Sequence, residues 1–218
     1  MAIERVFVDV DVQHDFCEPS GALYVPGSPN DTYRALTRFA VSRGIPILGS
    51  VDSHAWDAWE FASSETRGPA GEKPGFPDHC VKGTPGWLKV TGTLPPRFRF
   101  VPNVEAAHVG FIVGELLRGA THGVYFEKEV YSLFANPLAE PFVAHLMAQA
   151  GGAPELCVYG VATDYCVKAA ALGLARRGIR TTLLTDATAG ITPEGTRAAL
   201  EELAAAGVRL STAAEILR

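Results

Sequence analysis

The sequence contains few cysteines, and none of them form a recognisable framework. Cys17, Cys80, Cys157 and Cys166 are the four cysteines among 218 residues, and no two are spaced as a CxxC pair or a zinc finger. A disulfide scaffold is typical of small secreted chains, whereas this chain is large. We therefore expect reduced thiols and a cytoplasmic location.

The sequence also lacks a basic run, a signal peptide and a long apolar segment. The formal net charge is -5 at pH 7, so a nucleic acid is a poor candidate partner. The first residues, MAIERVFVDVD, have no apolar core of the kind a signal peptide needs. No stretch approaches the roughly 18 uninterrupted apolar residues of a membrane span. These absences predict a protein without nucleic-acid or membrane partners.

The residues that are present predict an alternation of strands and helices. Short apolar runs, typical of strands covered on both faces, occur at Val6–Val12, Ile45–Val51, Val124–Phe126, Leu156–Val161 and Arg180–Thr185. Helical patterns lie between them at Asp31–Ser42, Pro137–Ala150 and Thr163–Arg177, and Thr192-Pro193-Glu194 opens a further helix. This alternation predicts an α/β domain with a parallel sheet flanked by helices.

One segment interrupts this rhythm. Residues 53–103 are rich in glycine and proline and contain all three tryptophans. A long irregular stretch inside a compact domain is usually functional or disordered, and the aromatic residues argue against disorder. Because ligands of α/β sheets bind beyond the carboxyl ends of the strands, candidate residues are sought there.

Two acids lie at the end of the first predicted strand. Asp9 and Asp11 are two residues apart in an apolar run, so in an extended strand they would face the same side. A buried acid is costly unless it is paired or has a function. Residue types alone leave open which of the two is functional and whether either only caps a neighbouring loop.

The second predicted strand is followed by a candidate metal site. Asp52 and His54 are two residues apart and can point toward one ion. His79, in the irregular segment, could provide a third ligand, and Glu60 a fourth oxygen ligand. The alternative is that Asp52 and His54 are surface residues or share a local hydrogen bond.

A lysine and a cysteine follow two further strands. Lys128, if buried near a thiol, would favour the thiolate. Thr163 is a suitable N-cap residue, which would place Cys166 in the first turn of the next helix, where the helix dipole also favours a thiolate. The alternatives are a solvated lysine and a cysteine that serves as a small core residue.

Taken together, five segments resemble the isochorismatase-like cysteine hydrolases, and within them the nicotinamidase branch. They are Asp11-Val12-Gln13-His14-Asp15-Phe16, Asp52-Ser53-His54, residues 79–86 (HCVKGTPG), Lys128 with Tyr131-Ser132 and Phe134, and residues 160–167 (GVATDYCV). The resemblance covers nearly the whole chain, and the last segment is the most specific.

The resemblance implies a catalytic role for three side chains. Asp11, Lys128 and Cys166 match the family's triad, so the resemblance selects Asp11 over Asp9. Val161-Ala162 matches a peptide bond that is cis in the family, and the N–H groups of Ala162 and Cys166 would form the oxyanion site. The implied reaction converts nicotinamide to nicotinic acid and ammonia through a cysteine thioester, within nicotinamide recycling toward NAD.

The resemblance also implies a metal site, a pocket and a fold. Asp52, His54 and His79 match the ligands of one divalent metal ion, with zinc expected first and iron or manganese as alternatives. Phe16, Phe76 and Tyr131 match positions that line the substrate pocket. The implied fold is a three-layer α/β/α, Rossmann-like domain with a six-stranded parallel sheet, covering residues 1–218 and using a short last strand near Val208.

Two features depart from the family pattern. Position 60 is a histidine ligand in some members, whereas Glu60 stands here as a tentative ligand. Residues 103–122 look like an insertion relative to the family pattern, and this segment could act as a lid, an oligomer contact or a pocket wall. The competing interpretations are a hydrolase for another small amide or carbamoyl compound, and an inactive binding protein with the same fold. The sequence leaves a homo-oligomer open.

Overall fold

The fold is built on one parallel sheet. It is seen in a computed structural model that describes residues 2–68, 70–104 and 108–218. Seven strands in these residues follow the spatial order β3-β4-β2-β1-β5-β6-β7. They are β1 (Arg5–Val10), β2 (Ile47–Asp52), β3 (Phe98–Val101), β4 (Gly123–Lys128), β5 (Glu155–Val161), β6 (Thr181–Ala189) and β7 (Arg209–Ser211). The α/β class with a parallel sheet is confirmed.

The expectation of six strands was wrong by one. The additional strand is β3, which lies at one edge of the sheet and pairs only with β4. Its sequence, FRFV, sits inside the irregular segment, and Phe98 is 41% exposed. A short edge strand with a polar residue in its middle carries little of the apolar signal that identified the buried strands.

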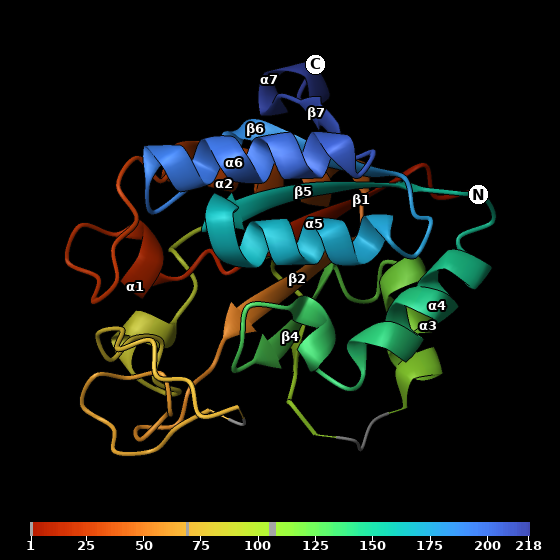
Figure 1. Cartoon of the computed structure of the whole chain (residues 1–218). Helices are drawn as coiled ribbons and strands as arrows, with labels where there is room; N and C mark the ends of the chain where they lie inside the picture. Colours follow the sequence, from red (N-terminus) through yellow and green to blue (C-terminus); the bar gives the residue numbers. More distant parts are fainter. Residues whose placement is uncertain (1, 69, 105–107) are drawn as a thin grey trace.

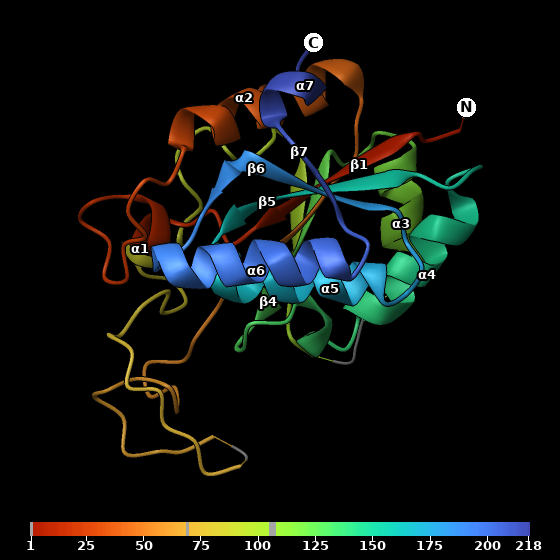
Figure 2. The same ribbon diagram turned by 45° about the horizontal axis from the view of Figure 1, so that its top comes forward.

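Helices cover both faces of the sheet and complete three layers. Figure 2 shows α2 and α7 on one side of the sheet and α3, α4, α5 and α6 on the other. The helices are α1 (His14–Cys17), α2 (Asn30–Arg43), α3 (Val109–Leu117), α4 (Ala139–Gln149), α5 (Lys168–Ala175), α6 (Pro193–Ala205) and α7 (Ala213–Ile216). No helix within the described ranges is both long and apolar enough to cross a membrane.

Each face of the sheet has its own apolar core. Val6, Val8 and Val10 of β1 pack with α3–α6, whereas Phe7 of the same strand packs with α2 and α7. Because successive residues of a strand point to opposite faces, a run of apolar residues serves both cores. The uninterrupted apolar runs in the sequence therefore correspond to strands buried on both sides.

The chain between β2 and β3 contains the long irregular segment, which projects from the carboxyl ends of the strands (Figure 1). It includes the short 3-10 turn η1 (Pro85–Trp87). A second such turn, η2 (Leu133–Ala135), follows β4. In the 103–122 segment predicted as an insertion, the structure has α3, which connects β3 to β4 and packs against α4. Residues 105–107 of that segment lie outside the described ranges.

Candidate active site

The sheet topology brings the candidate residues to one point. The chain builds β2, β3 and β4 on one side of β1 and then β5, β6 and β7 on the other, so the topological switch lies between β1 and β5. Ligands of such sheets bind in the crevice beyond the carboxyl ends at this switch. Asp11 follows β1 here, and Cys166 lies in a π-helical turn, η3 (Thr163–Val167), that follows β5.

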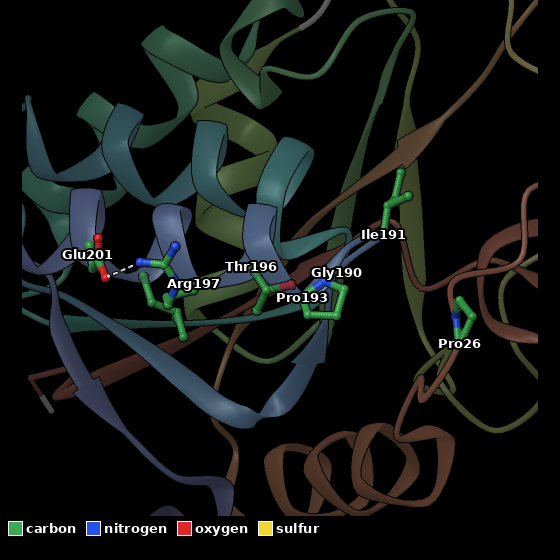
Figure 3. Close-up of a pocket in the computed structure, with 8 residues that line it drawn as sticks. Pro26, Gly190, Ile191, Pro193, Thr196, Arg197 and Glu201 are labelled. Carbon is green, nitrogen blue, oxygen red and sulfur yellow. Dashed lines mark hydrogen bonds and ion pairs between the residues drawn. The ribbon is translucent and has the colours of Figure 1, made fainter.

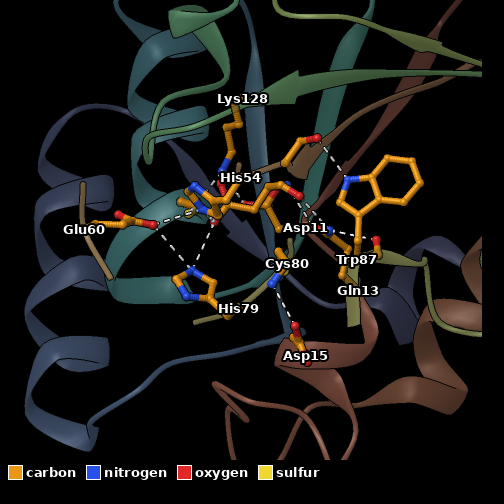
Figure 4. Close-up of polar contacts among 12 residues, drawn as sticks. Asp11, Gln13, Asp15, His54, Glu60, His79, Cys80, Trp87 and Lys128 are labelled. Atoms are coloured by element: carbon orange, nitrogen blue, oxygen red, sulfur yellow. Dashed lines mark hydrogen bonds and ion pairs between the residues drawn. The ribbon is translucent and has the colours of Figure 1, made fainter. Parts of the chain in front are cut away.

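Lys128 is the centre of a buried charge cluster at the end of β4. Its Nζ lies 2.8 Å from Asp11 Oδ2 and 2.8 Å from Asp52 Oδ1. The same Nζ is 3.6 Å from Cys166 Sγ. The side chains of Lys128 and Asp11 have no exposed surface. The three residues of the predicted triad therefore meet in one buried group. Two of them, Asp11 and Lys128, are labelled in Figure 4.

Burial and charge oppose one another in this group. Burial alone would lower the pKa of Lys128, but the carboxylates of Asp11 and Asp52 raise it well above its ordinary value, so the lysine remains charged. Burial would raise the pKa of Asp52, but Lys128 and the nearby histidines hold it well below its usual range. Lys128 therefore stays charged and Asp52 stays ionised in this buried group.

The thiol behaves differently from the sequence-based expectation. Burial raises the pKa of Cys166 well above its ordinary value; Lys128 opposes this, while Asp11 and Asp52 add to it. The expected resting thiolate is therefore not favoured, because the effect of burial on the pKa of this thiol outweighs the opposing effect of Lys128. The geometry instead favours a protonated thiol with a proton acceptor beside it. One carboxylate oxygen each from Asp11 and Asp52 and Cys166 Sγ all lie within 4.8 Å of one another.

Asp9 and Asp11 do not face the same side, which corrects the prediction from strand alternation. Lys89 Nζ donates to Asp9 Oδ1 at 2.6 Å, and Asp9 takes no part in the cluster around Lys128. β1 ends at Val10, and Asp11 has a φ of 50°. Because the backbone leaves the extended conformation at Asp11, the two-residue period no longer applies there.

Polar side chains hold the ends of β1 and β2 in register. Gln13 Nε2 donates to the carbonyl oxygen of Asp52 at 2.8 Å, and its Oε1 accepts from the Asp52 N–H at 2.7 Å. Ser50 Oγ donates to Asp11 Oδ1 at 2.8 Å. Gln13 also donates to the carbonyl oxygen of Trp87 at 2.9 Å, a contact drawn in Figure 4. The acid on β1 and the acid on β2 are thus fixed relative to each other.

The predicted metal ligands gather beside this cluster. One atom each from Asp52, His54, Glu60 and His79 lies within 4.8 Å of the others, and all four residues are buried. His54 Nε2 is 2.9 Å from Glu60 Oε1 and 3.3 Å from Asp52 Oδ2. His79 Nε2 is 3.5 Å from Glu60 Oε1 and 3.7 Å from Asp52 Oδ2 (Figure 4).

The donor chemistry of these four residues fits a divalent metal ion. Both ring nitrogens of His54 are buried, and neither makes a well-aligned hydrogen bond within the described part of the chain, although Nε2 lies close to Glu60. His79 Nδ1 lies 2.7 Å from the carbonyl oxygen of Pro77; if it donates there, Nε2 keeps a lone pair for a ligand bond. Burial opposes a charge on His54, but Asp52 and Glu60 raise its pKa to about 9. Carboxylates that attract a proton to this position also attract a cation.

Several backbone contacts hold the loop that carries His79 against the sheet. Asp15 Oδ2 accepts from the N–H of Cys80 at 2.7 Å. The N–H of His54 donates to the carbonyl oxygen of Cys80 at 3.1 Å, and the N–H of Phe76 donates to that of Glu60 at 2.9 Å. The expectation that residue 79 folds back from the irregular segment is confirmed.

A small pocket opens onto Cys166 and three of the predicted metal ligands. Phe16, Phe76 and Tyr131, the three residues expected to line it, do so. Asp52, Glu60, His79 and Cys166 also line it. Its walls further include Leu23, Tyr165 and Ile191, which the sequence reasoning did not identify. Tyr165 could have been found because it directly precedes Cys166, but nothing in the sequence marked Leu23 or Ile191.

The turn that carries Cys166 differs from a simple helix start. The Val161–Ala162 peptide bond is cis, as the resemblance implied. The prediction that Thr163 is the N-cap residue was wrong, because Ala162 occupies that position and Thr163 lies inside the turn. The hydroxyl group of Thr163 is buried and has no hydrogen-bond partner among the described residues. The π-helical turn still places Cys166 one turn after β5. Ala162 and Cys166 are both buried here, 8% and 6% exposed.

Known proteins resemble this chain along most of its length. The Isochorismatase domain family matches residues 5–215. The nicotinamidase/pyrazinamidase of Mycobacterium tuberculosis is 30% identical over 208 residues, covering 94% of this chain and 97% of the relative. The nicotinamidase of Escherichia coli is 30% identical over 222 residues, covering 97% and 96%.

Solved structures show the same fold. The pyrazinamidase of Pyrococcus horikoshii, solved in complex with zinc, superposes with a TM-score of 0.66 at 27% identity, covering 96% of this chain and 99% of that one. The nicotinamidase/pyrazinamidase of Bacillus subtilis superposes with a TM-score of 0.68 at 23% identity, covering 95% and 99%. The matched range, the shared fold and the residues gathered at the switch point agree: this chain belongs to the isochorismatase family.

Proposed function

We propose that this chain hydrolyses nicotinamide to nicotinic acid and ammonia, with Cys166 as the nucleophile. The observation that carries the proposal is the convergence on Lys128 Nζ of Asp11, Asp52 and Cys166, in a pocket also lined by Glu60 and His79. The two relatives at 30% identity are nicotinamidases, which supports this substrate.

In the first half-reaction, Cys166 attacks the carboxamide carbon. Asp11 takes the thiol proton as the carbon–sulfur bond forms, because burial raises the pKa of the Cys166 thiol and the attacking form must lose its proton. The backbone N–H groups of Ala162 and Cys166 donate to the oxyanion of the tetrahedral intermediate. Asp11 then returns the proton to the nitrogen, and the carbon–nitrogen bond breaks to release ammonia and leave a thioester.

In the second half-reaction, a water molecule attacks the thioester. Asp11 again accepts a proton, and as the carbon–sulfur bond breaks it returns this proton to Cys166 Sγ, which gives the carboxylic acid and the Cys166 thiol. Lys128 stays charged throughout, holding Asp11 beside the sulfur atom at a distance fixed by the 2.8 Å ion pair. Phe16, Phe76 and Tyr131 pack against the pyridine ring.

We further propose that Asp52, His54, His79 and Glu60 bind one divalent metal ion. A bound ion would supply a Lewis-acidic position for the ring nitrogen of the substrate, next to the pocket that holds the ring. Two imidazoles and two carboxylates suit zinc, iron or manganese. Zinc is the first choice, because the similar pyrazinamidase of Pyrococcus horikoshii is a zinc complex. A cytoplasmic location stays a prediction, as does the assignment of residues 1–218 to one domain.

The direct test is ammonia release from nicotinamide by the purified protein and by Cys166→Ala. We expect the variant to lose about 10⁴-fold in turnover or more, because no other group can form the thioester. Cys157→Ala is the matched control, since Cys157 is a buried core thiol away from the pocket and should retain turnover. Wild-type turnover in Cys166→Ala would refute the mechanism. No release by metal-loaded wild type would redirect the search to other amides, starting with carbamoyl compounds.

The metal assignment is tested without turnover. Glu60→Ala should weaken zinc binding at least about tenfold in competition with a chromogenic chelator, since a buried charged ligand is lost. Glu60→His should restore tight binding with one negative charge fewer. Glu65→Ala, an exposed acid of the same loop, is the control. Unchanged zinc affinity in Glu60→Ala would exclude Glu60 as a ligand.

A further inference from the structure

A second cavity adjoins the substrate pocket on the side of Ile191. Its volume is about 660 Å³, and it lies over the start of α6. Ile191 lines both this outer groove and the substrate pocket. Figure 3 shows Ile191 beyond the start of α6, its side chain directed away from that helix. The groove residues are Pro26, Gly190, Ile191, Pro193, Thr196, Arg197, Leu200 and Glu201.

The same two loops form the walls of both cavities. Leu23 lines the substrate pocket, and Pro26, three residues later in the same loop, lines the groove. On the opposite side, Ile191 belongs to both, and Gly190 and Pro193 on either side of it line the groove. The groove therefore adjoins the substrate pocket, and Ile191 lies between the two.

Both walls are anchored to segments that carry the reacting groups. Asp164, two residues before Cys166, accepts from the N–H of Ile191 at 3.0 Å and from the N–H of Thr192 at 3.3 Å. The other loop is held by the N–H of Leu23, which donates to the carbonyl oxygen of Asp15 at 3.1 Å. Anchored walls fix the position of the opening relative to Cys166, as a binding subsite requires.

The lining of the groove indicates what it can bind. Arg197 is its one cationic residue, and Arg197 Nη1 lies 3.0 Å from Glu201 Oε1. Thr196 Oγ1 donates to the carbonyl oxygen of Thr192 at 2.8 Å. The remaining side chains are apolar. Because the charged pair is neutral overall and the hydroxyl is already bonded, the groove favours an uncharged apolar group over a phosphate or a carboxylate.

We propose that the groove is an outer subsite for an apolar substituent on the ring of the carboxamide substrate, and that Ile191 is the specificity-determining residue at its entrance. The proposal rests on the proposed amidase function, since the ring must occupy the inner pocket. A substituent on the ring would pass Ile191, which is 38% exposed, and pack against Pro26, Pro193 and Leu200. The chemical class is thus an alkyl- or aryl-substituted aromatic carboxamide.

The test compares kcat/KM for nicotinamide with that for 5-phenyl- and 5-(4-methylphenyl)nicotinamide, whose substituents are adjacent to neither the ring nitrogen nor the carboxamide. The quantity of interest is the ratio of the better phenyl substrate to nicotinamide. Ile191→Ala, which widens the entrance, should raise this ratio about tenfold, and Ile191→Trp, which fills it, should lower the ratio about tenfold. Leu210→Ala, an exposed apolar residue on β7, is the control and should leave the ratio unchanged.

The subsite is supported only if the kcat/KM ratio rises at least threefold in Ile191→Ala and falls at least threefold in Ile191→Trp. Any other pattern overturns it. Failure of the amidase proposal gives a different result, because wild type would then release no ammonia from nicotinamide. In that case, calorimetric titration of Cys166→Ala with the phenyl compounds decides the subsite alone. The affinity of Cys166→Ala for the phenyl compounds must fall at least threefold when Pro26→Trp is added to fill the groove. An unchanged affinity overturns the subsite.

Discussion

Two buried lysine–carboxylate pairs lie close together in this protein, and they differ in what surrounds them. Lys128 is 2.8 Å from Asp11, and Lys89 is 2.6 Å from Asp9; none of the four side chains is exposed. Lys128 has a second carboxylate and a thiol beside it, at the edge of a pocket. Lys89 instead lies 5.0 Å from the centre of the Tyr125 ring, within the core.

The difference shows that a buried ion pair does not by itself mark an active site. The Asp9–Lys89 pair ties the segment after η1 to the central strand, where an isolated bridge also joins Gln13 and Lys89. Asp9 Oδ2 has no hydrogen-bond partner in the described residues, and burial raises the pKa of Asp9 against the effect of Lys89. The pair around Lys128 is distinguished by its reactive neighbour and its access to a ligand.

Among the substitutions that test the difference between the two pairs, Lys128→Met is expected to have the largest effect. Without the ammonium group, Asp11 and Asp52 repel one another and Asp11 no longer holds its position beside Cys166. We expect nicotinamide turnover to fall about 10³-fold or more. Ammonia release measures it, with circular dichroism to verify folding. A folded Lys128→Met variant with turnover within tenfold of wild type would contradict the catalytic assignment.

Lys89→Met should affect stability and not chemistry. It leaves Asp9 buried without a cation, which costs about 3–5 kcal/mol in the free energy of unfolding. Urea unfolding measures this loss, and turnover of the folded fraction should stay within tenfold of wild type. Loss of turnover in a fully folded Lys89→Met variant would show that the Asp9–Lys89 pair also contributes to catalysis.

The smallest effect is expected when both members of the structural pair are removed. Replacing a buried ion pair by apolar residues of similar volume is often neutral, so Asp9→Leu with Lys89→Met should recover most of the stability lost in Lys89→Met alone. We expect the double variant to unfold within about 1 kcal/mol of wild type in urea. A double variant as unstable as the single one would show that Lys89 contributes through contacts other than Asp9.

Much of the site could be predicted because its residues follow buried strands. The runs ending near Asp11, Asp52, Lys128 and Cys166 marked the carboxyl ends of β1, β2, β4 and β5, and parallel strands bring those ends together. The order of the motifs then indicated the family, which the matched range confirms. The catalytic and metal-binding roles remain predictions that the geometry supports.

What could not be predicted depends on contacts between distant segments. Lys89 pairs with a residue 80 positions away, so nothing local to either residue distinguishes it from a solvated lysine. Ile191 reaches the pocket because Asp164 binds its loop, 27 positions earlier in the chain. The position of Asp11 relative to Asp9 depends on one backbone angle, a φ of 50°, which no alternation pattern contains.

Gln13 has a consequence for the choice among isomeric substrates. Its side-chain amide donates to and accepts from the backbone of Asp52, as a paired strand residue would, and so fixes the end of β2 against the end of β1. The spacing between Asp52, the predicted metal ligand at the end of β2, and Cys166, which follows β5, is then set by the sheet. In the proposed binding mode, an aromatic amide reacts only if its ring nitrogen and its carboxamide carbon match that spacing. Pyridine carboxamides with the nitrogen moved to another ring position should therefore be poor substrates, although their size and polarity are the same.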